Sequence, residues 1–123
     1  MSEFLGLIIE DDPSLAEIYK EALVFAGYRP EVLDNGRIAI EYLKTVKPDL
    51  ILLDLHLPEV SGRDILQKIK ENEKLATTKV LITSADMLMA EELRDEVAIV
   101  LVKPISFMQL SDLAKRFLPE QVK

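Results

Sequence analysis

The sequence predicts an α/β fold in which a parallel sheet of five strands is covered by helices on both faces. Two observations support this prediction. Short apolar runs alternate along the chain with amphipathic segments of helical periodicity,. The apolar runs have the length of strands that are buried on both faces, and the amphipathic segments supply the crossover helices that parallel neighbours need.

Five apolar runs are predicted as strands because each is short and is bounded by charged or turn-forming residues. In chain order the predicted strands are 4–9, 31–33, 50–53, 80–82 and 99–102. The third run is the most apolar of the five, and the second is the weakest prediction.

The segments between and after these strands are predicted as helices. The first helix begins with Asp12 as its N-cap and Pro13 in its first turn, and it ends at Gly27,. Asn35-Gly36 predicts a turn before the second helix,. Apolar residues recur at helical spacing at Leu15, Ile18, Tyr19, Ala22, Leu23 and Ala26, at Ile38, Ala39, Tyr42, Leu43 and Val46, at Ile65, Leu66 and Ile69, and at Leu110, Leu113, Ala114, Phe117 and Leu118.

Length and composition indicate a single domain over residues 1–123, with a core of about 4–118 and no output domain after it. A hydrophobic content of 49% is enough to fill one core at this length,. The 22 acidic and 15 basic residues give a net charge of -7, which repels the phosphate backbone of nucleic acids,. Direct binding to DNA or RNA is therefore not expected.

The chain has no cysteine, which excludes disulfides, thiolate catalysis and cysteine-based metal sites,. Any metal must then bind oxygen ligands or the single histidine, His56. The N-terminus carries no signal-like segment, and the longest apolar runs reach about a third of a membrane span of ~20 residues. A soluble cytoplasmic protein without membrane contact is the expectation.

Residues that can do chemistry gather directly after the predicted strands, where ligands bind in parallel α/β sheets. They are Glu10, Asp11 and Asp12 after the first strand, Asp54 after the third, Thr83 and Ser84 after the fourth, and Lys103 after the fifth. Clustered carboxylates supply hard ligands for Mg²⁺, a carboxylate can act as a nucleophile, and a lysine and a hydroxyl can bind phosphoryl oxygens. Each residue alone also has a structural explanation, such as a helix cap, so the prediction depends on their joint placement.

Four short motifs resemble those of the response-regulator receiver domains of two-component systems, in the family's order and near its spacing. L-I-I-E-D-D (7–12) resembles the family's acidic pair, D-L-H-L-P-E-V-S-G (54–62) its phosphoacceptor loop, and I-T-S (82–84) and V-K-P (102–104) its hydroxyl and lysine signatures. The resemblance covers about 4–117. It implies the flavodoxin-like receiver fold, with strand order 2-1-3-4-5 and five helices on both faces.

The same resemblance implies roles for individual residues. Asp54 is the implied phosphoacceptor, and Lys103 and Thr83 are implied to bind the phosphoryl group. The Lys103-Pro104 peptide bond is expected to be cis. The implied Mg²⁺ ligands are Asp11, Asp54, the backbone carbonyl of His56, and Glu10, which binds directly or through water.

The implied function is a phosphorylation-dependent signalling switch, not an enzyme that turns over a separate substrate. A histidine kinase or histidine phosphotransfer protein is the expected phosphoryl donor, a downstream protein is the expected partner, and a second copy of the chain is a further candidate. The alternative is a magnesium-dependent phosphohydrolase with an aspartyl-phosphate intermediate, which normally needs a second acid near Asp54, where position 56 is His,. A nucleotide or flavin module is disfavoured because no glycine-rich loop follows the first strand.

Two positions near the implied site depart from the family pattern. Val100 stands where an aromatic side chain usually moves with the threonine, and we expect it to fill space behind Thr83,. Ser84 stands where Ala or Gly is usual. The ring of His56 is expected either beside the phosphoryl group or in solvent.

The fourth helix also departs from the family pattern, because the segment before the lysine signature is short. A short helix is expected at about 87–94. Its apolar residues Met87, Leu88 and Met89 either contact a partner or complete the core,.

Overall fold

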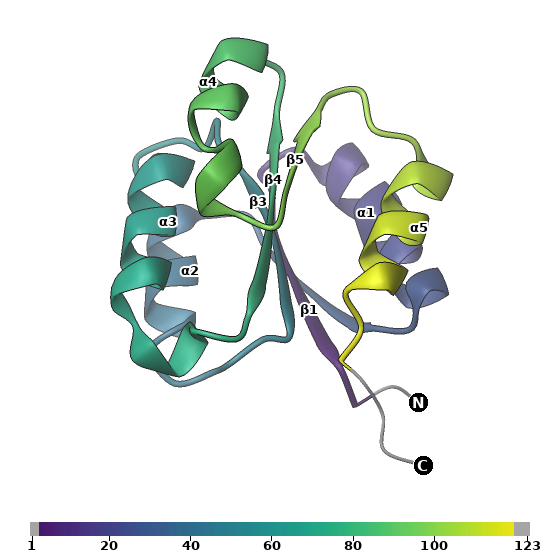
Figure 1. Ribbon diagram of the computed structural model, residues 1–123, viewed down its shortest axis with the longest axis horizontal. Coiled ribbons are helices and arrows are strands. Elements are labelled where there is room, and N and C mark those ends of the chain that lie inside the picture. The colour runs from purple at the N-terminus through teal and green to yellow at the C-terminus, as the bar shows by residue number, and fades with distance from the viewer. Residues whose placement is uncertain (1–2, 120–123) are drawn as a thin grey trace.

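Five parallel strands form one sheet in the order β2-β1-β3-β4-β5, which confirms the expected fold (Figure 1). The computed structural model describes residues 3–119. The strands are β1 (Leu5–Ile9), β2 (Arg29–Leu33), β3 (Leu50–Asp54), β4 (Lys79–Ser84) and β5 (Ile99–Val102). Every residue of β1 and β3 is buried, whereas β2 and β5 lie at the edges of the sheet and are more exposed.

Helices cover both faces of this sheet. The α-helices are α1 (Pro13–Ala26), α2 (Gly36–Tyr42), α3 (Gly62–Glu71), α4 (Met87–Glu92) and α5 (Phe107–Arg116), with single 3-10 turns at Glu73–Leu75 and Arg94–Glu96. Figure 1 shows α1 and α5 together on one face and α2 and α3 together on the other, while α4 contacts β4 and β5. Within residues 3–119, no helix has the length and hydropathy of a membrane span,.

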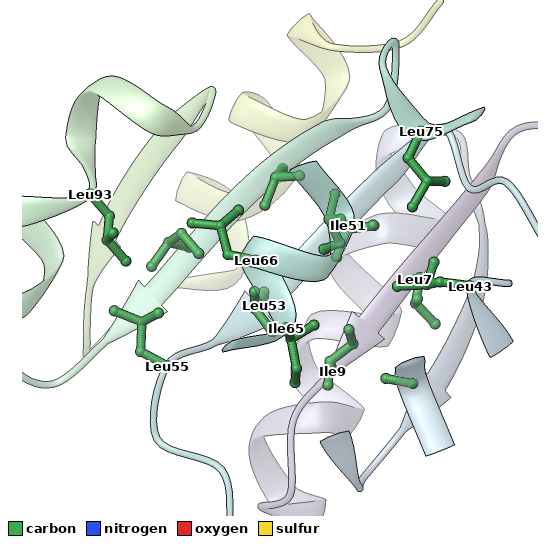
Figure 2. Close-up of a cluster of buried hydrophobic side chains, with 14 residues drawn as sticks. Leu7, Ile9, Leu43, Ile51, Leu53, Leu55, Ile65, Leu66, Leu75 and Leu93 are labelled. Atoms are coloured by element: carbon green, nitrogen blue, oxygen red, sulfur yellow. The ribbon is translucent and has the colours of Figure 1, made fainter. Parts of the chain in front are cut away.

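The sheet separates two clusters of buried apolar side chains, because successive residues of a strand point to opposite faces. Leu7, Ile9 and Leu53 belong to the cluster that Figure 2 shows, which packs against α2 and α3. Ile8 and Leu52 belong to the second cluster, which packs against α1 and α5. The central strands are therefore apolar on both faces, and this is why they appear in the sequence as continuous apolar runs.

The first helix begins and ends as predicted. The Asp12 side chain accepts hydrogen bonds from the backbone N–H groups of Ser14 (2.9 Å) and Leu15 (3.2 Å), and it is the N-cap of α1. Gly27 adopts a left-handed conformation with a φ of 110°, which a residue with a Cβ rarely adopts, and it ends the helix,. Ile18 is 41% exposed, so the buried face of α1 is narrower than the helical spacing suggested.

The second helix differs most from the prediction. Asn35-Gly36 is not a separate turn, because Asn35 is the N-cap of α2 and its side chain accepts hydrogen bonds from the first turn. The helix is short and ends at Tyr42. The expected inward position of Ile38 was wrong, because Ala39 takes the buried face and Ile38 is 53% exposed.

Several strands and helices begin or end a few residues away from their predicted bounds. β3 runs through Asp54 and β4 runs through Ser84, so residues predicted to follow these strands extend the ladder instead. β2 begins earlier than predicted, at Arg29, and α5 ends earlier, at Arg116. Because Asp54 pairs with Thr83, the added residues bring chemically active side chains into the fixed register of the sheet.

Candidate functional site

The carboxyl ends of four strands bring together polar residues that are far apart in the sequence. Asp54 is the last residue of β3 and pairs with Thr83 of β4, while Glu10 follows β1 and Lys103 follows β5. Glu10 and Asp54 are each 2% exposed and Thr83 is 1% exposed. The structure thus places these four residues, which the sequence analysis singled out, at one buried edge of the sheet.

Three carboxylates form a cluster at this edge. Glu10, Asp11 and Asp54 each present an oxygen within 4.8 Å of the others, and Asp11 is the exposed member. Burial raises the pKa of the Glu10 carboxyl, and the charge of Asp54 adds to this rise against the hydrogen bond from Lys103. Clustered carboxylates that repel one another and reach solvent on one side have the hard oxygen donors that fit Mg²⁺.

Lys103 is the cation of the site. Its Nζ donates a hydrogen bond to Glu10 Oε1 at 3.0 Å and lies 3.5 Å from Asp54 Oδ1. Burial by itself lowers the pKa of Lys103, but the hydrogen bond to Glu10 and the charge of Asp54 outweigh burial and raise it. The Lys103-Pro104 peptide bond is cis, as expected. The ammonium is therefore charged and lies between two buried carboxylates.

The loop after β3 packs tightly against the end of the strand. The backbone N–H of His56 donates to Asp54 Oδ1 (3.1 Å), and that of Gly62 donates to Leu55 O (3.2 Å). A Cβ on Gly62 would lie 2.5 Å from the carbonyl oxygen of Asp54 and from the Cα of Leu55. Because glycine alone allows this approach, Gly62 helps to hold the loop that orients the Asp54 carboxylate.

A contact that the sequence analysis missed joins the loop after β3 to the end of β4. His56 Nε2 lies 3.1 Å from Ser84 Oγ, and Ser84 Oγ accepts a hydrogen bond from the backbone N–H of Asp86 (2.9 Å). The Asp86 side chain in turn caps α4 by accepting from the Met89 N–H (3.2 Å). The His56 ring therefore contacts the end of β4. The available signal was that His56 and Ser84 were predicted to follow neighbouring strands, with Ser84 at a position where Ala or Gly is usual.

Two buried hydroxyls within residues 3–119 have no hydrogen-bond partner, those of Thr83 and Tyr19. Thr83 is one of the residues that the sequence analysis assigned to the site. Tyr19 was expected only as part of the inner face of the first helix, because helical periodicity shows which face is buried but not where a hydroxyl ends. The need of both groups for a partner appears only in the structure.

The expected position of Val100 behind Thr83 was wrong, because Val100 is not the residue of β5 that pairs with Thr83. In the register of the sheet Val100 pairs with Ile82, and both pack in the cluster under α2 and α3, while Thr83 pairs with Leu101. Val100 therefore supports Ile82 rather than the Thr83 side chain.

The charge arrangement predicts that Lys103→Met destabilises the protein in the absence of Mg²⁺ by about 3 kcal/mol, because two buried carboxylates then lack their cation. Adding Asp54→Asn should restore part of this loss, since it removes one of the two like charges. Chemical unfolding in EDTA measures both changes. Unaltered stability of the single variant would contradict the proposed balance of charges.

Comparison with known proteins identifies the family. Residues 7–115 match the model of the response regulator receiver domain. DivK of Brucella anthropi, a polar-differentiation response regulator, is 28% identical over 115 residues, which cover 91% of this chain and 94% of DivK. The transcriptional regulatory protein TrcR of Mycobacterium tuberculosis is 35% identical over 83 residues, which cover 68% of this chain. The matched region spans only 32% of the length of TrcR.

A solved structure extends the likeness to three dimensions. The response regulator TrrA of Thermotoga maritima, solved in complex with Mg(2+)-BeF, superposes with a TM-score of 0.82 and 26% sequence identity, covering 94% of this chain and 99% of TrrA. The family match runs from β1 into α5 and thus includes every strand end that builds the site. We conclude that the chain belongs to the response regulator receiver domains, the phosphorylation-dependent switches of two-component signalling.

Proposed function

We propose that Asp54 accepts the phosphoryl group in this chain. The observation that carries the proposal is the position of the Asp54 carboxylate, which is buried at the end of the central strand, 3.5 Å from the Lys103 ammonium. The N–H of His56 holds its Oδ1. A carboxylate nucleophile has no proton to lose, so the site needs positioning and charge neutralisation more than a general base.

The acidic cluster supports a Mg²⁺ requirement. The proposed ligands are Glu10, Asp11, Asp54 and the backbone carbonyl of His56. The complex of the relative TrrA with Mg(2+)-BeF also favours Mg²⁺ as the ion. Bound Mg²⁺ would supply positive charge that offsets the carboxylates and the incoming phosphoryl group.

The proposed phosphoryl donor is a phosphohistidine on a histidine kinase or a phosphotransfer protein. An oxygen of Asp54 attacks the phosphorus, a P–O bond forms, and the P–N bond breaks with its electron pair left on the imidazole nitrogen. Lys103 then exchanges its contact with Glu10 for a phosphoryl oxygen. Thr83 donates a hydrogen bond to another oxygen, and the lack of a partner for its buried hydroxyl supports this role,.

We infer that the switch passes from Thr83 to α4. Phosphorylation adds a charge of roughly -1.5 to -2 beside the end of β4. This charge favours any movement that brings hydrogen-bond donors to the phosphoryl oxygens. Ser84 accepts a hydrogen bond from the Asp86 N–H, and Asp86 caps α4. Met87 and Leu88 at the start of α4 are 61% and 78% exposed, and they offer a downstream protein an apolar surface,.

Phosphoacceptance predicts that acetyl phosphate with Mg²⁺ adds one phosphoryl group to the wild-type protein and none to Asp54→Asn. The amide lacks the nucleophilic carboxylate, and EDTA should prevent labelling of the wild type. Intact-protein mass spectrometry measures the addition, with the exposed Asp64→Asn on α3 as the control that retains it. Full labelling of Asp54→Asn would refute the assignment.

The two exposed acids after β1 are expected to separate metal binding from helix capping. Asp11→Ala removes an anionic ligand and should weaken Mg²⁺ binding strongly, with little loss of stability. Asp12→Ala removes the cap of α1 and should cost about 1 kcal/mol of stability while Mg²⁺ affinity changes little. Calorimetric titration and thermal unfolding of both variants test this, and equal losses of Mg²⁺ affinity would show the assignment to be wrong.

The proposed route through Thr83 predicts different effects at two neighbouring strands. Thr83→Ala should leave Asp54 labelling largely intact but abolish the change in amide exchange over 83–97 that beryllofluoride causes in the wild type. Val100→Ala should keep that change and lose about 1 kcal/mol of packing stability. A loop that does not respond in the wild type, together with a responsive β5, would contradict the route.

A further inference from the structure

The hydroxyl of Tyr19 is buried and has no hydrogen-bond partner within the described part of the chain. Tyr19 lies on α1 and is 1% exposed, and no described residue forms a hydrogen bond with its hydroxyl. Tyr28, in the same apolar cluster, shows the usual arrangement, because its hydroxyl donates to Ala114 O at 2.7 Å. An unbonded buried hydroxyl is unfavourable, so a state of the protein that gives the Tyr19 hydroxyl a partner is favoured.

Tyr19 lies in the first half of α1, and its side chain packs in the cluster between the sheet, α1 and α5. Long side chains on a helix lean toward the helix N-terminus, and α1 starts directly after the acidic loop,. Tyr19 packs in the cluster that contains Ile105, two residues after Lys103. The charged groups close enough to influence its pKa are Lys103, Glu10, Asp54 and Asp12. Burial raises that pKa, so the hydroxyl is protonated and able both to accept and to donate.

Lys103 has hydrogen-bond donors that change partners when the site is used. An ammonium carries three N–H groups, and in this structure one donates to Glu10 at 3.0 Å while Asp54 lies at 3.5 Å,. If Glu10 becomes a metal ligand, as the proposed function requires, its contact with Lys103 weakens. One N–H then turns to the phosphoryl group, which leaves a second N–H of the ammonium available to the Tyr19 hydroxyl, and that hydroxyl has no other partner among the described residues,.

We propose that the Tyr19 hydroxyl positions Lys103. Once Lys103 leaves Glu10 for the phosphoryl group, this hydroxyl accepts a hydrogen bond from an N–H of the lysine. This inference rests on the proposed function. It assigns Tyr19 no contact with the phosphoryl group itself. The hydroxyl holds the lysine ammonium in place, and it thus stabilises the phosphorylated state relative to the unphosphorylated state.

The test compares beryllofluoride binding in the presence of Mg²⁺ for wild type and Tyr19→Phe. The variant loses one oxygen atom, so we expect metal-free stability equal to or above that of the wild type and a beryllofluoride affinity roughly tenfold lower, the size of one charge-assisted hydrogen bond. Tyr28→Phe is the matched control, since it removes a satisfied hydroxyl from the same cluster and should lower stability while keeping the affinity. In the Lys103→Met background Tyr19→Phe should have no further effect on affinity.

Several outcomes would overturn the inference. They are an unchanged affinity in Tyr19→Phe, an equal loss in Tyr28→Phe, or a full additional loss in the Lys103→Met background. Failure of the wild type to bind beryllofluoride would instead contradict the proposed function. A second measurement needs no substitution: in the beryllofluoride form of wild type, a nuclear Overhauser effect between the non-exchangeable Lys103 ε protons and the Tyr19 ring should appear, and its absence also overturns the inference.

Discussion

Two buried carboxylates beside one ammonium are the constraint on which the rest of the site depends. Glu10 and Asp54 are both 2% exposed, and Lys103 is the cation that contacts both. Burying like charges near each other is unfavourable unless positive charge compensates them. Burial and the charge of Asp54 raise the pKa of Glu10 despite the hydrogen bond from Lys103. A site with this imbalance is suited to take up a divalent cation and then to release Lys103 for another anion.

The parallel sheet makes this arrangement available. All five strands run in the same direction, so the residues that end them meet at one edge although up to 93 positions separate Glu10 from Lys103 in the chain. The two apolar clusters on either side hold β1 and β3 rigidly, and the pairing of Asp54 with Thr83 extends the ladder into the site. The apolar packing on both faces of the sheet thus fixes the positions of the polar side chains at its edge.

Two hydroxyls without partners mark the parts of the site that are not yet satisfied in this state. Thr83 stands at the end of β4, next to the Ser84 and Asp86 contacts that lead to α4. Tyr19 lies on α1, in the cluster that packs against α1 and α5. A state that leaves both hydroxyls unpaired is unfavourable, because each is a buried polar group,. A phosphorylated state that pairs them has a free-energy advantage over it.

The sequence by itself determined the fold class, the strand order through its family motifs, and the residues at the strand ends, because periodicity and short motifs depend on local spacing. It misplaced Ile38 and the Asn35-Gly36 segment, since the face that a short helix buries is decided by packing and not by periodicity. Only the tertiary structure decided which groups are paired. Examples are the contacts of Lys103, the contact between His56 and Ser84, and the Tyr19 hydroxyl that has no partner among the described residues. Each depends on how side chains from separate elements meet in space, and spacing along the chain carries no information on this.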